Sequence, residues 1–146
     1  MQTAIVEEVQ GMLVIPNWVS NERSTNMKSE VFAVDFDGTL CQSAYPWIGD
    51  PIYEMIDWIK ELKRMGHRII LWTCREGMSL VNAIVWCADQ GLFFDAVNDN
   101  IETHVKKYGN NCRKIFADYY IDDKAVYPSA MPFVFERSNY DVRRNG

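Results

Sequence analysis

The stretch VFAVDFDGTL, residues 31–40, decides the fold of this chain. Four apolar residues run directly into two aspartates that lie one residue apart, and glycine and threonine follow. A short apolar run that ends in a turn predicts a buried strand of a parallel sheet. Ligands of open parallel sheets bind just beyond the carboxyl ends of the strands. We therefore expect Asp35 and Asp37 at a binding site, with Gly38 freeing the backbone for a sharp turn.

The neighbouring carboxylates of Asp35 and Asp37 are electrostatically unfavourable by themselves. They repel each other unless a divalent cation or a shared proton neutralises the charge. Asp and Gly are also common turn residues, so a strand followed by an Asp-rich turn is the alternative interpretation of this motif alone. The choice depends on what the rest of the chain brings to the same edge of the sheet.

The composition is that of a single soluble globular domain. The chain has 146 residues, of which 48% are apolar and 24% charged, and its net charge is -5. An acidic chain disfavours a broad nucleic-acid-binding surface, although it is compatible with a local basic patch. No run is long enough to span a membrane and no signal peptide is recognisable. The four cysteines show no CxxC pair and no metal-ligand spacing, so we expect reduced thiols in a cytoplasmic protein.

Apolar periodicity predicts two regions along the chain. Residues 1–28 form an N-terminal extension, in which two apolar runs around a glycine predict a hairpin, and residues 29–146 form the main domain, to which the motifs described below assign a catalytic role. Asp50 and Pro51 are expected at the N-cap and first position of a helix that Gly66 ends. The other expected elements are a strand at 68–73, a helix at 78–90, a strand at 93–97, a loop with room for a helical turn at 98–112, and strands at 117–121 and 132–135.

This alternation of strands and helices predicts an α/β fold, with a three-layer, Rossmann-like parallel sheet whose helices cover both faces by right-handed crossovers. Polar residues follow three of its strands at one edge. These are Asp35 with Asp37, Thr73, and the pair Asp122 with Asp123. Turn preferences alone do not explain this coincidence, so the carboxylates are better interpreted as a site than as solvated turns.

The residue types at this edge suit a phosphoryl group. Aspartates supply the oxygen ligands that Mg²⁺ prefers. Thr73 offers a hydroxyl and a backbone N–H, and Lys114 offers a cation a few residues before the strand at 117–121. Such a cradle stabilises charge on the equatorial oxygens of a phosphoryl group, and a carboxylate can act as the nucleophile by forming an aspartyl-phosphate.

The motifs resemble those of the haloacid-dehalogenase-like (HAD) phosphohydrolase superfamily. The resemblance covers residues 31 to about 135 and rests on DFDGT, ILWTCREG and IDDK. It implies that Asp35 is the nucleophile and a Mg²⁺ ligand. It also implies that Asp37 is the general acid and base, with its backbone carbonyl on the metal, and that Thr73 holds the phosphoryl group.

The same resemblance assigns the remaining charged residues. Lys114 is the lysine of the third motif, with Arg113 as its rival for that role. Asp123 aligns with the metal-ligand acid, and Asp122 binds through water or orients Lys114. Within the superfamily, YPWIG, ILWTCREG and IDDK look like a group of small HAD-like proteins of bacteria and phages, and the IDDK ending is also similar to deoxyribonucleotidases.

A second set of residues is expected to contact the substrate. Arg75 can grip an anion from the rim of the site, and the rings of Tyr45 and Trp47 can stack on a base or merely wall the pocket. Adjacent Cys74 and Arg75 do not make a cysteine phosphatase, which needs an arginine further downstream. The predicted substrate-binding residues are Gly38, Thr39, Tyr45, Trp47, Cys74 and Arg75.

Short insertions after the first motif and after the third strand predict a capless HAD form. A bare site favours a large substrate, or shielding by the N-terminal hairpin or by a second subunit of a homo-oligomer. The leading hypothesis is a Mg²⁺-dependent phosphomonoesterase for a nucleotide or another small phosphate. The alternatives are a phosphatase for nucleic-acid ends or phosphoproteins, which the acidic composition disfavours for nucleic acid, and a non-catalytic module that binds a nucleotide or a partner.

Overall fold

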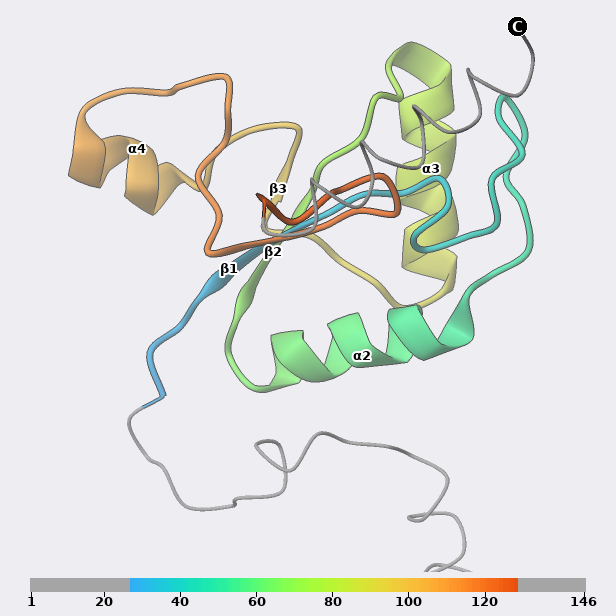
Figure 1. Cartoon of the computed structure of the whole chain (residues 1–146), viewed down its shortest axis with the longest axis horizontal. Coiled ribbons are helices and arrows are strands. Elements are labelled where there is room, and N and C mark those ends of the chain that lie inside the picture. Colours follow the sequence, from blue (N-terminus) through green and yellow to red (C-terminus); the bar gives the residue numbers. More distant parts are fainter. Residues whose placement is uncertain (1–26, 129–146) are drawn as a thin grey trace, which may run out of the picture.

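The computed structural model of the chain describes residues 27–128 (Figure 1). The predicted N-terminal hairpin and the predicted strand at 132–135 lie outside these residues. The elements, in chain order, are β1 (Val31–Val34), α2 (Tyr53–Arg64), β2 (Arg68–Leu71), α3 (Gly77–Asp89), β3 (Ala96–Val97), α4 (Glu102–Tyr108) and β4 (Tyr119–Ile121).

The sheet has four strands in the order β3-β2-β1-β4, and every pairing is parallel. The strand of the opening motif, β1, is central. It pairs with β2 in the register Val31↔Arg68 and with β4 in the register Phe32↔Tyr119. The predicted Rossmann-like α/β fold is therefore confirmed. Within residues 27–128, no separate cap domain is inserted, since every helix and strand belongs to this one layered unit.

Alternate residues of β1 serve the two faces of the sheet, as the period of two along a strand requires. Phe32 and Val34 pack in one core cluster, whereas Val31 and Ala33 pack in another. All of these residues are buried, which is why this strand is continuously apolar. Figure 1 shows α2 and α4 on opposite sides of the strands, and this arrangement gives the predicted three layers.

The two longer helices cover one face of the sheet. The buried side of α2 consists of Ile56, Ile59 and Leu62, which recur at helical spacing. In α3, the buried residues are Ala83 and Cys87, and they join the same cluster as Phe32 and Val34. The opposite face is covered more sparsely by the segment around α4. Residues 98–112 were expected to be mainly loop, but α4 forms seven residues of helix within them.

The predicted N-terminus of the first helix is wrong. The helix begins at Tyr53, with Ile52 as its N-cap, and not at Pro51 with Asp50 as its cap. The backbone of the preceding residues is used elsewhere: the carbonyl of Asp50 accepts a hydrogen bond from Gln42 at 2.8 Å, and Pro51 bridges Cys41. These bonds close the base of the loop that follows β1 and override the local capping signal. In the part of the chain that the structure describes, no helix has both the length and the apolar character to cross a membrane.

Candidate metal centre at the carboxyl edge of the sheet

Parallel pairing brings three chain segments together at one edge of the sheet. Val34, the last residue of β1, pairs with Leu71 at the end of β2 and with Ile121 at the end of β4. Asp35 then continues the register, because its N–H donates to the carbonyl of Ile121 at 2.9 Å. The residues just after β1, β2 and β4 are thus forced to share a small volume.

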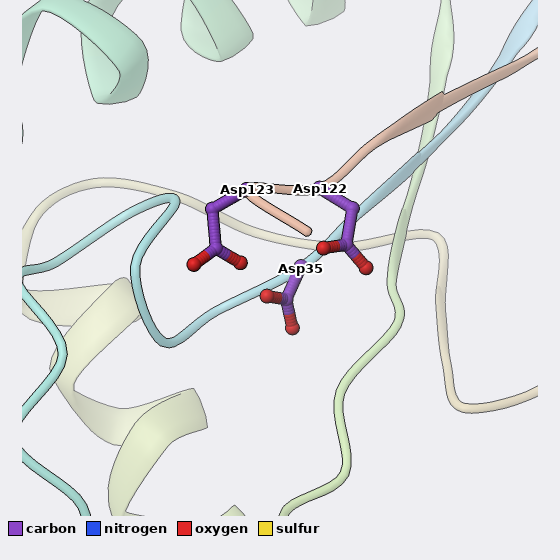
Figure 2. A group of neighbouring side chains, drawn as sticks. All are labelled: Asp35, Asp122 and Asp123. Carbon is purple, nitrogen blue, oxygen red and sulfur yellow. The ribbon is translucent and has the colours of Figure 1, made fainter. Parts of the chain in front are cut away.

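Three carboxylates meet there. Asp35, Asp122 and Asp123 each offer an oxygen atom, and these atoms all lie within 4.8 Å of one another. Figure 2 shows Asp35 from the end of β1 beside the two aspartates of the turn after β4. Asp35 is partly buried, whereas Asp122 and Asp123 are exposed, so the cluster is reachable from solvent. A set of close carboxylate oxygens suits a hard divalent cation.

The electrostatics of Asp35 reflect this crowding. The pKa of Asp35 is raised to about 6, mainly by burial and in addition by the nearby Asp122 and Asp123, including a hydrogen bond with Asp123. The backbone N–H of Phe36 acts in the opposite direction. The ionised form of Asp35 is therefore disfavoured in the metal-free protein. A bound cation would reverse the sign of this effect, since it neutralises the neighbouring charges.

The loop after β1 builds a cradle for Asp123. Gly38 has φ +81°, and a Cβ added there would lie 2.3 Å from Asp123 Oδ2. Thr39 is buried, and its Oγ1 accepts a hydrogen bond from the backbone N–H of Asp123 at 3.2 Å. Of the residues predicted to bind substrate, Gly38 thus leaves room for the Asp123 side chain and Thr39 bonds the Asp123 backbone. This close seating of Asp123 beside Asp35 fits a metal ion.

The turn after β2 is held by an asparagine that the sequence analysis did not single out. The side chain Oδ1 of Asn98 accepts from the N–H of Thr73 at 2.8 Å. The Asn98 N–H donates to the carbonyl of Leu71 at 2.8 Å, and its φ is 49°. The Thr73 hydroxyl accepts from the N–H of Arg75 at 3.2 Å. The only signal in the sequence was an asparagine at the end of the third parallel strand.

Arg75 lies inside the protein and not at the rim, where it was expected. Its side chain is 1% exposed and forms a two-pronged pair with Asp37, at 2.8 Å from Nε to Oδ2 and 2.7 Å from Nη2 to Oδ1. Tyr45 and Trp47, by contrast, are 65% and 78% exposed, and Cys74 is exposed as well. Of the predicted substrate-binding residues, Arg75 is therefore buried and fully bonded, Gly38 and Thr39 lie against Asp123, and Tyr45, Trp47 and Cys74 face solvent.

The predicted third-motif cations lie on exposed parts of the chain. Lys114 places its Nζ 5.8 Å from the centroid of the Tyr120 ring, and in the region 27–128 it takes part in no ion pair. Its rival Arg113 pairs with Asp99 at 2.9 Å. The structure thus brings Asp35, Asp122 and Asp123 together and joins Asp37 to Arg75. The role of Lys114 at the carboxylates stays a prediction.

Comparison with known proteins identifies a relative of this chain. A conserved protein of Bacteroides thetaiotaomicron with a solved structure is 40% identical to this chain, with a TM-score of 0.61. The match covers 68% of this chain and 79% of that one. The chain belongs to the family of this conserved Bacteroides protein. No protein-family model matches the chain, and no curated protein matches it.

The raised pKa of Asp35 predicts a pH-dependent effect of the substitution Asp35→Asn in metal-free protein. Because the pKa is about 6 in the folded state and 3.8 ordinarily, protonated Asp35 stabilises the fold at low pH. This contribution disappears as the pH rises through the folded pKa. The free energy of unfolding of the variant minus that of the wild type should therefore be larger at about pH 8 than at about pH 4. The expected increase is about 1–3 kcal/mol. Urea unfolding of both proteins in chelator measures the difference, and an equal gain at both pH values would contradict it.

The seating of Asp123 against Gly38 predicts that Gly38→Ala is more damaging than Gly66→Ala. Both glycines have positive φ, +81° and +93°, but only Gly38 has an atom within 4 Å of an added Cβ. Both variants should lose about 1–2 kcal/mol from the left-handed backbone, and Gly38→Ala should lose about 1–3 kcal/mol more from overpacking. Urea unfolding of the two variants in parallel tests this. Equal losses would show that Asp123 moves away freely.

Proposed function

We propose that the protein is a Mg²⁺-dependent phosphomonoesterase of the haloacid-dehalogenase-like type. The observation that carries the proposal is the convergence of Asp35, Asp122 and Asp123 within 4.8 Å at the carboxyl edge of a parallel sheet. The motifs that place these residues there are those that resemble the superfamily. The family relationship to the conserved Bacteroides protein supports the fold, and the chemistry is argued from the residues of this chain.

The metal ligands in this proposal are the side chains of Asp35 and Asp123, the backbone carbonyl of Asp37, and Asp122 directly or through water. When bound, Mg²⁺ would neutralise the carboxylates and the charge of a phosphate ester beside them. The raised pKa of Asp35 supports this assignment, because a bound cation would stabilise ionised carboxylates that otherwise repel one another. The exposure of Asp122 and Asp123 leaves the centre open to a substrate.

Asp35 is the proposed nucleophile. Its carboxylate oxygen attacks phosphorus, and the bond between phosphorus and the ester oxygen breaks while Asp37 gives a proton to the departing alkoxide. Water then attacks the phosphorus of the aspartyl-phosphate, with Asp37 taking its proton, and the bond to the Asp35 oxygen breaks. The products are the alcohol and inorganic phosphate, and Asp35 is regenerated.

Thr73 and Lys114 complete the proposed phosphoryl site. The Thr73 hydroxyl accepts a hydrogen bond from the Arg75 N–H, so its own proton is left to donate to a phosphoryl oxygen. Lys114, whose side chain is exposed, is proposed as the cation, as the third motif of the superfamily implies. Tyr45 and Trp47 expose 65% and 78% of their surface and offer rings on which a nucleotide base can stack.

The experiment that tests the proposed function is a survey of phosphate esters with purified protein. It includes nucleoside monophosphates, sugar phosphates, a phosphopeptide, a 3′-phosphorylated oligonucleotide and p-nitrophenyl phosphate, each with Mg²⁺, with Ca²⁺ and with excess chelator. Release of inorganic phosphate that needs Mg²⁺ and is not supported by Ca²⁺ is the expected result, because Ca²⁺ accepts more ligands at longer distances. Full activity in chelator, or no activity on any ester, would overturn the proposal.

The nucleophile assignment predicts that Asp35→Asn abolishes turnover in folded protein. An amide is nearly isosteric with the carboxylate but a very poor nucleophile, so the rate should fall on the order of 1,000-fold or more. The matched control is Asp57→Asn, which changes an exposed carboxylate on α2 that lies 4.0 Å from Lys60. The control should retain wild-type activity, and Asp35→Asn with near wild-type rates would rule out the covalent mechanism.

A further inference from the structure

Arg75 makes more polar contacts than any one ligand-binding role requires. Its guanidinium donates to both carboxylate oxygens of Asp37. It also donates to the carbonyl of Trp47, at 2.7 Å from Nη2, and to the carbonyl of Pro46, at 3.3 Å from Nη1. The group is thus bonded to two different parts of the site at once, the residue after Phe36 and the backbone of the loop that follows β1.

The faces of the guanidinium are covered as well. Its central carbon lies 5.0 Å from the centroid of the Phe36 ring and 5.2 Å from that of Tyr45. These contacts are cation–π interactions, which strengthen when the cation is removed from water. With a side-chain exposure of 1%, Arg75 is not available to an anion from solvent. Arg75 can therefore affect the site only through the groups to which it is hydrogen-bonded.

The geometry is specific to arginine. A planar guanidinium matches the two oxygens of a carboxylate with a pair of parallel hydrogen bonds and still has donors left for two carbonyls, whereas lysine offers a single charged nitrogen. The fork occupies one lone pair on each oxygen of Asp37 and leaves the others free. Since Asp37 is 22% exposed, the carboxylate is held in place and can still be reached.

We infer that Arg75 is a positioning residue, which fixes Asp37 and the Pro46–Trp47 backbone in one arrangement. The inference rests on the proposed function for the role of Asp37 as general acid. It assigns Arg75 no contact with the substrate. The loop that carries the exposed Tyr45 and Trp47 rings is thereby tied to the acid, so a change at one is transmitted to the other through a single buried side chain.

The first test compares leaving groups in Arg75→Lys and Arg75→Gln. An alkyl phosphate such as glycerol 2-phosphate needs its leaving group protonated, whereas p-nitrophenyl phosphate does not, because p-nitrophenolate is a good leaving group. Misplacing Asp37 should therefore lower kcat on the alkyl ester at least about tenfold more than on the aryl ester, with little change in KM. Equal losses on the two esters in folded protein would overturn the inference.

The matched control is Arg64→Gln, which breaks an exposed arginine–glutamate pair with Glu61 on α2. It should leave both esters at wild-type rates. Circular dichroism and thermal unfolding report whether each Arg75 variant folds. If Arg75→Gln does not fold, Arg75→Lys decides, because it keeps the charge but loses the fork.

The second test does not depend on activity. The carbonyl of Trp47 belongs to the peptide bond that chymotrypsin would cleave after this exposed ring, and Arg75 holds that carbonyl in the wild type. Both Arg75 variants should be cut there at least several-fold faster than the wild type and Arg64→Gln, with the site identified by mass spectrometry. If the wild type hydrolyses no ester, the proposed function fails and this cleavage alone decides the inference. Unchanged cleavage in the folded variants would overturn it.

Discussion

The structure depends on the parallel pairing of β1 with a neighbour on each side. The N–H of Asp118 donates to the carbonyl of Val31 at 2.8 Å at one end of the strand, and the N–H of Asp35 donates to Ile121 at the other. On the opposite side, the N–H of Trp72 donates to the carbonyl of Val34 at 2.8 Å. These bonds leave no freedom of register, so the segments after β1, β2 and β4 must end at the same place.

Each of the two outer strands, β4 and β3, is preceded by an aspartate that supports the pairing of the sheet at the opposite edge. The Oδ2 atom of Asp118, which precedes β4, accepts from the N–H of Val31 at 2.8 Å. Asp95, which precedes β3, accepts in the same way from the N–H of Ile69 at 2.8 Å. Each carboxylate satisfies a strand N–H that would otherwise lack a partner in the sheet. At the edge opposite the candidate metal centre, aspartates therefore stabilise the strand pairing. At the near edge, the aspartates are available to bind a metal ion.

The aspartates of the opening motif, Asp35 and Asp37, have opposite electrostatic environments although one residue separates them. Asp35 lies among other acids, which together with burial raise its pKa to about 6. Asp37 faces the guanidinium of Arg75. Because a nucleophilic carboxylate must be ionised, the proposed role of Asp35 needs a bound cation, which would lower this raised pKa. The guanidinium of Arg75 thus neutralises Asp37, whereas the cluster around Asp35 contains only acids and still needs a cation or a proton.

Local signals in the sequence were sufficient for the class of fold and for the carboxylate cluster. The apolar run 31–34, which ends in a turn, predicts a strand buried on both faces, and alternation with amphipathic helices makes its neighbours parallel. Asp35, Asp122 and Asp123 follow from that topology, since the carboxyl ends of parallel strands share an edge. The helix α4 is longer than the helical turn expected within residues 98–112, because seven residues carry too little periodicity to show its extent. The predicted cap at Asp50 was wrong because that backbone is bonded to the loop.

The sequence by itself determined that a parallel sheet ends in acids, because strand propensity and spacing are properties of short segments. Only the tertiary structure decided which polar groups those segments meet. Arg75 follows an exposed cysteine in the chain, yet it is buried against Asp37, which lies 38 residues earlier in the sequence. Asn98 reaches Thr73 only because β3 lies beside β2. Such partners depend on the distance between side chains after folding, and one-dimensional spacing does not contain that distance.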